Sequence, residues 1–191
     1  LSVVGIGSGT VRVGVHIAAP GLAIKPGSDI DVIAKSRMST VYMPGNKITM
    51  LPKSVVEQFS LDEGKYCPTL SFYLDFNEET LAIIQTESRI ESVLIKANLR
   101  HDHLSDWVTA ELLTQAPVAD LIVPEALKNV ELKDLQFLFR LAQKLKLDRE
   151  QVRGKPEIQT RPDFDFKLQK PSADQPLGDE VVQITQRKRG A

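Results

Sequence analysis

Apolar and polar residues follow two different periods along this chain, and these periods predict its strands and helices. The segments 1–4 and 11–18 are rich in valine and isoleucine and enclose three glycines, which is typical of a hairpin with a flexible turn. The apolar runs 69–76 and 81–86 predict a second hairpin around a polar turn. The segment 87–103 fits both the helical and the strand period, and we expect a strand.

Helical spacing marks three further segments. Ser28 or Asp29 is expected to cap a helix, and 105–114 is expected to form another. The clearest helical pattern covers 132–147. The residues expected on the packed face of the first helix are Ile30, Ile33, Ala34 and Met38, and those expected on the packed face of the last are Leu135, Leu138, Phe139, Ala142 and Leu145.

Turn-rich segments separate these elements. Prolines and mixed polarity predict a connector at 116–130, and strand-like runs recur at 161–168 and 181–186. We therefore expect an α+β fold, with a mixed but mainly antiparallel sheet packed by helices. A sheet-rich half would span 1–115, and the part 131–191 would contain the long helix and the terminal strands.

The charge composition changes this picture only by exclusion. The 191 residues include 24 basic and 25 acidic side chains, for a net charge of -1, so any site for a polyanion must be local. The single cysteine, Cys67, excludes an internal disulfide and suits a reducing compartment, for which the cytoplasm fits best. No run reaches the roughly 18 apolar residues that a membrane-spanning helix needs.

Few residues suggest catalytic chemistry directly. The sequence contains no GxSxG, Walker, HExxH or kinase motif. His101 and His103 flank Asp102 and could share a metal ion on one strand face, but apart from Asp106 a third ligand is missing nearby, and we favour polar surface residues. Asp29 and Asp31 lie where a helix begins, which favours capping over metal binding.

Two other residues have open interpretations on sequence alone. His16 lies within the apolar run VGVHIAA, where a hydrogen-bonded core histidine is favoured over a catalytic one. Tyr42, one of three tyrosines, lies in TVYMPGNKITMLP on a predicted turn between two short apolar runs. Its ring could pack in the core, or it could stay open for a base of single-stranded nucleic acid to stack on.

Several motifs in the first part of the chain occur in a fixed order. They are VGVHIA, the helix start KPGSDID, TVYMPG followed closely by ITMLP, and FSLDEG. In order and spacing they resemble the catalytic domain of the ribonuclease II and ribonuclease R family of exoribonucleases. A fainter similarity continues through ESVLIKANLRHDHLSDW and RPDFDF to ITQRKRGA, so the resemblance covers most of the chain.

The resemblance implies a magnesium-dependent enzyme that hydrolyses single-stranded RNA processively from its 3' end to nucleoside 5'-monophosphates. It also implies a mixed α/β catalytic domain flanked by small barrel-type RNA-binding domains. In the family, aspartates that bind Mg2+ precede the segment that 1–18 resembles, and a second catalytic set, including an arginine, follows the region matched by the end of this chain. We therefore expect no catalytic residue and no metal ligand here, but an interior part of the domain that is inactive without the remaining parts. The alternative is a noncatalytic RNA-binding protein on a decayed version of this domain.

The resemblance also implies RNA contacts within this chain. Tyr42 matches a family tyrosine that stacks on the 3'-terminal base. His101 occupies the position of a second family tyrosine and could stack or hydrogen-bond. Ile158 falls near an aromatic residue that clamps the terminal base in some members, and it could pack but not stack. Candidates for phosphate contacts are Arg161, Lys167 and the basic cluster 187–189.

Overall fold

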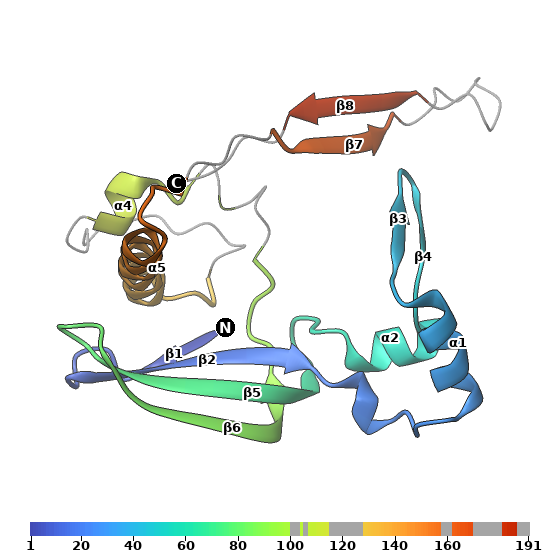
Figure 1. Ribbon diagram of the computed structural model, residues 1–191, viewed down its shortest axis with the longest axis horizontal. Coiled ribbons are helices and arrows are strands. Elements are labelled where there is room, and N and C mark those ends of the chain that lie inside the picture. The colour runs from blue at the N-terminus through green and yellow to red at the C-terminus, as the bar shows by residue number, and fades with distance from the viewer. Residues whose placement is uncertain (100–103, 105–106, 115–127, 158–161, 170–180, 187–191) are drawn as a thin grey trace. The chain divides into compact units, whose positions relative to one another are not determined.

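The computed structural model is a mixed α/β protein (Figure 1). It describes residues 1–99, 104, 107–114, 128–157, 162–169 and 181–186. Contacts within the chain divide it into two compact units. The first unit comprises Leu1–Pro20 and the described residues of 58–157, and the second comprises Gly21–Glu57 and the described residues of 158–189.

An antiparallel sheet forms the framework of the first unit. Its strands are β1 (Ser2–Val4), β2 (Thr10–Ala18), β5 (Tyr66–Asn77) and β6 (Ile83–Leu94), in the spatial order β1-β2-β5-β6. Both hairpins predicted from the sequence are confirmed, and the segment with two possible periods is a strand as far as Leu94. Valine, isoleucine, threonine and aromatic residues are frequent in these strands because their side chains pack well on a pleated surface. The expected α+β class with a mainly antiparallel sheet is therefore confirmed.

The glycine-rich loop between β1 and β2 holds a carboxylate. Gly5, Gly7 and Gly9 have φ values of 95°, 89° and 84°, a region that glycine adopts without strain. The N–H groups of Gly7 and Gly9 donate to the two carboxylate oxygens of Glu78 at 2.7 and 2.9 Å. These hydrogen bonds lower the pKa of Glu78, because they favour its ionised form. The glycines thus form the predicted turn, and Glu78 ties it to the β5–β6 turn.

The core of the first unit lies between one sheet face and helix α5 (Leu132–Arg153). Phe137 and Leu141 are buried on the helix side at 4% and 6% exposure. They are four residues apart, so they lie on one face of the helix. Burial of an apolar side chain of this size contributes about 1.5–3 kcal/mol. The buried residues on the sheet side are Val11, Val13 and Phe76.

The buried face of α5 differs from the predicted one. Ala142 and Leu145 of the predicted stripe are exposed, whereas Phe137 and Leu141 are buried and Leu138 packs against them in part. Apolar residues occur on more than one side of this helix, so their spacing alone could not choose between neighbouring stripes. Contact with the sheet decides which stripe is buried.

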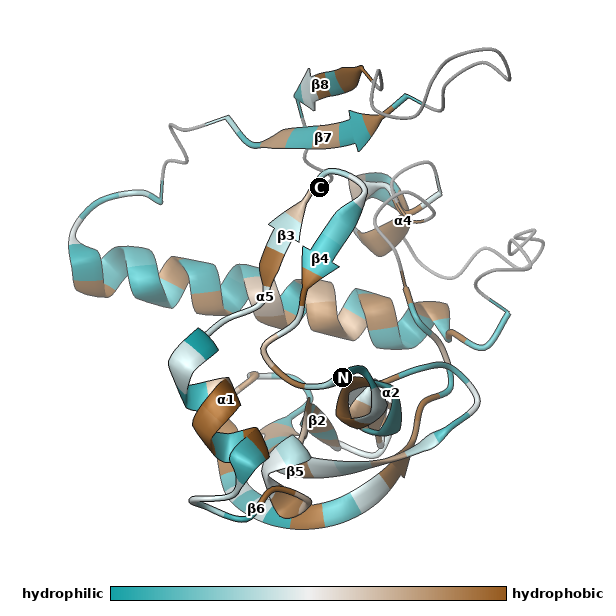
Figure 2. Ribbon diagram, turned by 90° about the vertical axis from the view of Figure 1, so that its right-hand side faces the viewer, coloured by the Kyte–Doolittle hydropathy of each residue, from teal (hydrophilic) through white to brown (hydrophobic). Residues whose placement is uncertain are grey.

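Helix α5 is also longer than the apolar pattern predicts. It continues past Leu147 to Arg153, for 22 residues in all. An ion pair between Lys144 and Asp148 at 2.6 Å supports the later turns, and Gly154, with φ 66°, is the left-handed C-cap. The hydropathy colouring shows mainly hydrophilic residues in this part of the helix (Figure 2). Within the described residues, no helix is both long and apolar enough to cross a membrane.

Helix α1 (Asp29–Arg37) in the second unit has the cap that the sequence predicts. Asp31 N donates to Ser28 Oγ at 3.4 Å, and the Asp31 carboxylate accepts from a backbone N–H before the helix at 2.8 Å. The carboxylate therefore helps to close the first turn. Ala34 is the buried residue of this helix, whereas Ile33 is 43% exposed and Met38 is a left-handed C-cap with 81% exposure, so the predicted places of Ile33 and Met38 on the packed face are wrong.

Short elements complete the described parts of the chain. They are the 3-10 helix η1 (Pro20–Leu22), helix α2 (Lys53–Phe59), and the strands β3 (Val41–Met43), β4 (Asn46–Ile48), β7 (Phe164–Leu168) and β8 (Val182–Gln186). The two strand-like runs predicted near the end of the sequence are confirmed as the antiparallel pair β7–β8.

Helix α4 (Ala110–Thr114) is shorter than the predicted helix. Residues 107–109 are not helical, and Thr109 Oγ1 accepts from the N–H of Leu112 at 3.2 Å, so Thr109 caps the helix. The expected start at 105–106 lies outside the described residues, as does most of the expected connector at 116–130.

The assigned face of α5 predicts a difference between two leucines of that helix. Leu141→Ala should lower the free energy of unfolding by about 2–5 kcal/mol, because it leaves a cavity in the core. The matched control is Leu147, which is 59% exposed on the same helix. Leu147→Ala should change the free energy of unfolding by no more than about 0.5 kcal/mol. Urea unfolding followed by circular dichroism measures both, and equal losses would contradict the assigned face.

Candidate nucleic-acid interface

The segment that contains Tyr42 forms a hairpin in the second unit. Strands β3 and β4 pair in antiparallel register, with Tyr42 directly opposite Lys47. Pro44 and Gly45 make the turn between them, and Gly45 has a φ of 74°. Proline followed by a glycine with positive φ is the residue pair that a type II turn favours. The chemistry of these two residues thus sets the pairing of the strands.

The ring of Tyr42 is open to solvent. Its exposure is 79%, and it lies in strand β3 rather than in the turn itself, where the sequence predicts it. All the residues of β3 and β4 are exposed. Of the two interpretations that the sequence left open, a ring packed in the core does not fit this exposure. An exposed flat ring is what stacking of an unpaired base requires.

Contacts within the second unit hold the hairpin at both ends. At its base, Arg37 Nη1 donates to the carbonyl oxygen of Thr49 at 2.8 Å. At its tip, Gly45 lies against the side chain of Leu168 on β7, so closely that a Cβ added at Gly45 would collide with it. These contacts matter because an isolated two-stranded hairpin is at best marginally stable in water.

The other residues predicted to contact RNA are only partly described. His101, Ile158, Arg161 and the cluster 187–189 lie outside the described residues. Lys167 is exposed on β7, next to Leu168. Of the predicted contacts, Tyr42 and Lys167 are therefore the two with a described position, and both belong to the second unit.

His16 in the first unit is hydrogen-bonded through both ring nitrogens. Nδ1 lies 2.8 Å from Ser71 Oγ, and Nε2 lies 2.8 Å from Ser2 Oγ. Burial lowers the pKa of the ring, because it disfavours the charged imidazolium. The predicted hydrogen bonding is confirmed, but the ring is half-buried rather than part of the core.

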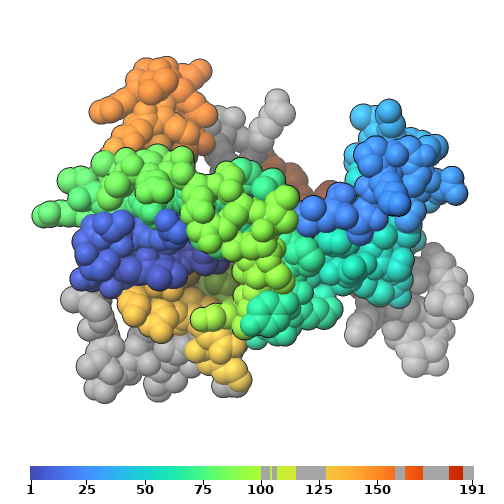
Figure 3. All heavy atoms as spheres, turned by 90° about the horizontal axis from the view of Figure 1, so that it is seen from below, coloured from blue at the N-terminus to red at the C-terminus, as the bar shows by residue number. Residues whose placement is uncertain are grey.

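Tyr73 on β5 contrasts with Tyr42. The guanidinium groups of Arg12 and Arg89 lie 5.3 and 4.9 Å from the centre of its ring, and its hydroxyl donates to Glu91 at 2.6 Å. Arg12 also donates two hydrogen bonds to Asp75, which lower the pKa of that carboxyl. Strand β6, which supplies Arg89 and Glu91, is visible at the surface in the space-filling view (green, Figure 3). The ring and the hydroxyl of Tyr73 are therefore already occupied by contacts with Arg12, Arg89 and Glu91.

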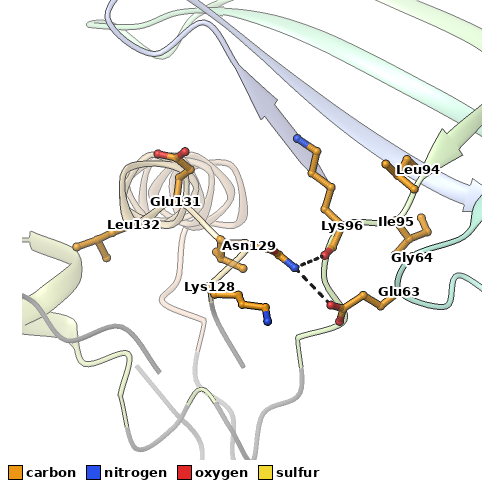
Figure 4. Close-up of a pocket in the computed structure, with 10 residues that line it drawn as sticks. Glu63, Gly64, Leu94, Ile95, Lys96, Lys128, Asn129, Glu131 and Leu132 are labelled. Atoms are coloured by element: carbon orange, nitrogen blue, oxygen red, sulfur yellow. Dashed lines mark hydrogen bonds between the residues drawn. The ribbon is translucent and has the colours of Figure 1, made fainter. Parts of the chain in front are cut away.

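A pocket of about 640 Å³ in the first unit is another candidate binding site (Figure 4). The side chain of Asn129 extends across the pocket, and its Nδ2 donates to Lys96 O at 3.2 Å and to Glu63 Oε1 at 3.5 Å. Its charged lining consists of Lys96, Lys128, Glu63 and Glu131, so the formal charges balance. Among the described residues that line it, none is aromatic, so the described lining offers no ring for a base to stack on.

The described residues do not form a metal centre. No group of three or more histidine, cysteine, aspartate or glutamate side chains among them could hold a metal ion. Asp31 is engaged at the start of α1, and His101 and His103 lie outside the described part of the chain. The described part of the chain therefore contains no set of ligands for the divalent metal ion that the family resemblance implies.

The chain is thus a mixed α/β protein, and its candidate surface for a ligand is the β3–β4 hairpin with the exposed ring of Tyr42. The family model described as the RNB domain matches residues 1–191. The chain therefore belongs to the RNB domain family, and the family that the sequence motifs indicated is confirmed.

Curated relatives carry the name Exoribonuclease 2. The protein from Buchnera aphidicola subsp. Acyrthosiphon pisum is 35% identical over 102 residues, which cover 53% of this chain and 16% of the relative. The protein from Proteus mirabilis is 28% identical over 134 residues, which cover 70% of this chain and 21% of the relative. This chain thus spans a small part of the length of each relative.

Solved structures share the fold. Apo RNase R of Mycoplasma genitalium has a TM-score of 0.69 at 19% identity, covering 98% of this chain and 26% of its own. An active-site mutant of the Dss1 exoribonuclease of Candida glabrata has a TM-score of 0.70 at 18% identity, covering 97% and 23%. Yeast Ssd1, a pseudonuclease, has a TM-score of 0.61 at 26% identity, covering 82% and 17%. The fold is thus common to nucleases and to a pseudonuclease.

The environment of His16 predicts a pH dependence of stability. Because the pKa of His16 is lowered in the folded state, the unfolded chain binds the proton first as the pH falls below about 6.5. The free energy of unfolding should therefore decrease from about pH 7.5 to about pH 5.5. His16→Gln keeps hydrogen-bonding groups but cannot titrate, so it should flatten this decrease. Urea unfolding across this range measures the effect.

His101 and His103 also titrate in this pH range, so their contribution to the pH dependence of stability needs a control. The double variant His101→Gln, His103→Gln should keep the part of the decrease that depends on His16. If His16→Gln instead shows the same pH dependence as the unmodified chain, the lowered pKa of His16 is contradicted.

Proposed function

We propose that this chain is part of the catalytic domain of a magnesium-dependent 3'-to-5' exoribonuclease that degrades single-stranded RNA to nucleoside 5'-monophosphates. The observation that carries the proposal is the exposed ring of Tyr42 on a hairpin of fixed register. Membership of the RNB domain family and the name of the curated relatives support it. RNase R of Mycoplasma genitalium, which shares the fold, has been solved in complex with ribose-methylated single-stranded RNA.

Tyr42 is the proposed platform for the base at the 3' end of the RNA. A tyrosine can stack on any base because every base has a flat π face, which suits an enzyme that must accept each nucleotide in turn. Stacking on an aromatic ring contributes about 1–3 kcal/mol per base. The exposure of this ring leaves room for such a base without rearrangement of the hairpin.

Further RNA contacts are proposed outside the described residues. His101 would stack on or hydrogen-bond to a nucleotide, and Arg161 would bind a phosphate, since arginine offers several donors in a fixed geometry. Both contacts are carried over from the family resemblance.

The role proposed for this chain is to bind the RNA rather than to cleave it. The metal-binding aspartates and the remaining catalytic groups are proposed to come from other parts of the same catalytic domain, which small barrel-type RNA-binding domains would flank. Mg2+ would activate the attacking water there. We also propose a reducing compartment, the cytoplasm, because Cys67 is free and buried and has no second cysteine to pair with.

The second candidate function is noncatalytic RNA binding on the same fold. The observation that favours it is the similarity to yeast Ssd1, a pseudonuclease, at 26% identity. The two candidates share the binding surface and differ in whether the metal-binding aspartates are present. A cleavage assay on the full-length protein separates them.

Tyr42→Ala should weaken binding of a single-stranded oligoribonucleotide by about 5- to 150-fold, because it removes the ring on which one base stacks. Tyr42→Phe should bind within about twofold of the unmodified protein, since the ring remains. Fluorescence anisotropy with the full-length protein in EDTA measures affinity without digestion.

The matched control for this loss is Tyr66→Ala, which removes a 70% exposed tyrosine from β5 in the first unit. It should leave the affinity unchanged. An RNA whose 3'-terminal nucleotide lacks its base tests the role more closely, because Tyr42→Ala should cause no further loss with it. Equal affinities of the Tyr42→Ala and Tyr66→Ala variants for ordinary RNA would rule out the stacking role.

If the catalytic groups lie outside this chain, the full-length protein and the 191-residue chain should differ in their ability to cleave RNA. With Mg2+ and a 5'-labelled oligoribonucleotide, the full-length protein should shorten the RNA stepwise from its 3' end, whereas the 191-residue chain should leave it intact. Denaturing gels measure the products. Robust digestion by the 191-residue chain would refute the placement of the catalytic groups outside it. Binding without digestion by the full-length protein would favour the noncatalytic alternative.

A further inference from the structure

The cross-strand partner of Tyr42 gives its hairpin a second binding group. Lys47 lies directly opposite Tyr42 in the register of β3 and β4. Directly opposite residues of an antiparallel pair project from the same face, with their Cβ atoms about 4.5–5.5 Å apart. An aromatic ring and an ammonium group therefore start from neighbouring points on one surface.

We propose that Lys47 neutralises a backbone phosphate next to the nucleotide whose base stacks on Tyr42. This inference rests on the proposed function, and it names a phosphate-binding residue that the sequence motifs did not indicate. A lysine acts as a mobile point charge on a flexible stem, so it can follow a phosphate without fixed geometry. One face of the hairpin would then bind a nucleotide at two points, the base by stacking on Tyr42 and the phosphate by the charge of Lys47.

The charge around Lys47 supports this role. Between residues 38 and 52, Lys47 is the only charged side chain, so this stretch has a local positive charge on a chain with a net charge of -1. Lys47 is exposed, and within the described part of the chain no carboxylate forms an ion pair with it. By contrast, lysines with an acidic partner in the described residues include Lys53, Lys65, Lys133 and Lys144.

The two faces of the hairpin differ in character. Side chains alternate across a strand, so Val41 and Met43 project from the face opposite to Tyr42, and Ile48, the partner of Val41, projects with them. Asn46, the partner of Met43, also projects from that second face, which is therefore mainly apolar and uncharged. The ring and the charge are thus concentrated on one face, which is the face that suits a polyanion with stacked bases.

The test is the salt dependence of RNA affinity. Each phosphate contact with single-stranded nucleic acid contributes about 0.7 to the slope of log K against log salt concentration. Lys47→Ala should therefore reduce the slope by about 0.7 and weaken binding by about fivefold at 0.1 M salt. Lys47→Arg should keep the slope. Anisotropy titrations of the full-length protein in EDTA at several salt concentrations give these values.

Lys53→Ala is the matched control, because it removes the same charge from the same unit at an exposed lysine that pairs with Glu57. It should leave the slope unchanged. An RNA with an uncharged methylphosphonate in place of the terminal linkage identifies the phosphate, since Lys47→Ala should cause no further loss with it.

The outcomes separate this inference from the proposed function. If Tyr42→Ala weakens binding while Lys47→Ala behaves like Lys53→Ala, the role of Lys47 is overturned and the stacking role stands. If neither Tyr42→Ala nor Lys47→Ala changes RNA affinity, both the inference and the proposed RNA-binding role of this hairpin are overturned. Thermal unfolding of each variant should match the unmodified protein, because both side chains are exposed.

Discussion

A proline and a glycine set the register of the β3–β4 hairpin. Pro44 restricts its own backbone, and Gly45 supplies the positive φ of 74° that closes the turn. Because side chains alternate across a strand, a slip of one residue would move Tyr42 to the opposite face and separate it from Lys47. The turn therefore decides whether an aromatic ring and a positive charge share one surface, and the proposed interface depends on that arrangement.

The distribution of charge explains how a nearly neutral chain can still present a surface for a polyanion. In the first unit, charged groups are used within the fold: Arg12 binds Asp75, and the glycine loop holds Glu78. These contacts lower the pKa values of Asp75 and Glu78, because they favour the ionised carboxylates. The β3–β4 hairpin has a different composition, with one lysine and no carboxylate, so its charge is available to a ligand.

The sequence predicted the elements that local chemistry determines. Alternating apolar residues identified both long hairpins, and Ser28 identified the start of α1, because pairing and capping depend on neighbouring residues. It did not predict which stripe of α5 is buried, since that depends on contact with distant Val11 and Phe76. Periodicity likewise placed Met38 on a packed face, although the helix ends there. The motif with Tyr42 was visible at once, but the partner position of Lys47 required the strand register.

The central claim is that an RNA 3' end lies on the face of the hairpin that carries Tyr42. A single 5-iodouridine at the 3' terminus of an oligoribonucleotide, bound to the full-length protein in EDTA and irradiated, crosslinks to the residue that contacts its base. Mass spectrometry of the digested product should map the crosslink to Tyr42, and Tyr42→Ala should abolish it. A crosslink that maps to the sheet of the first unit, and that persists in the Tyr42→Ala variant, would contradict the account.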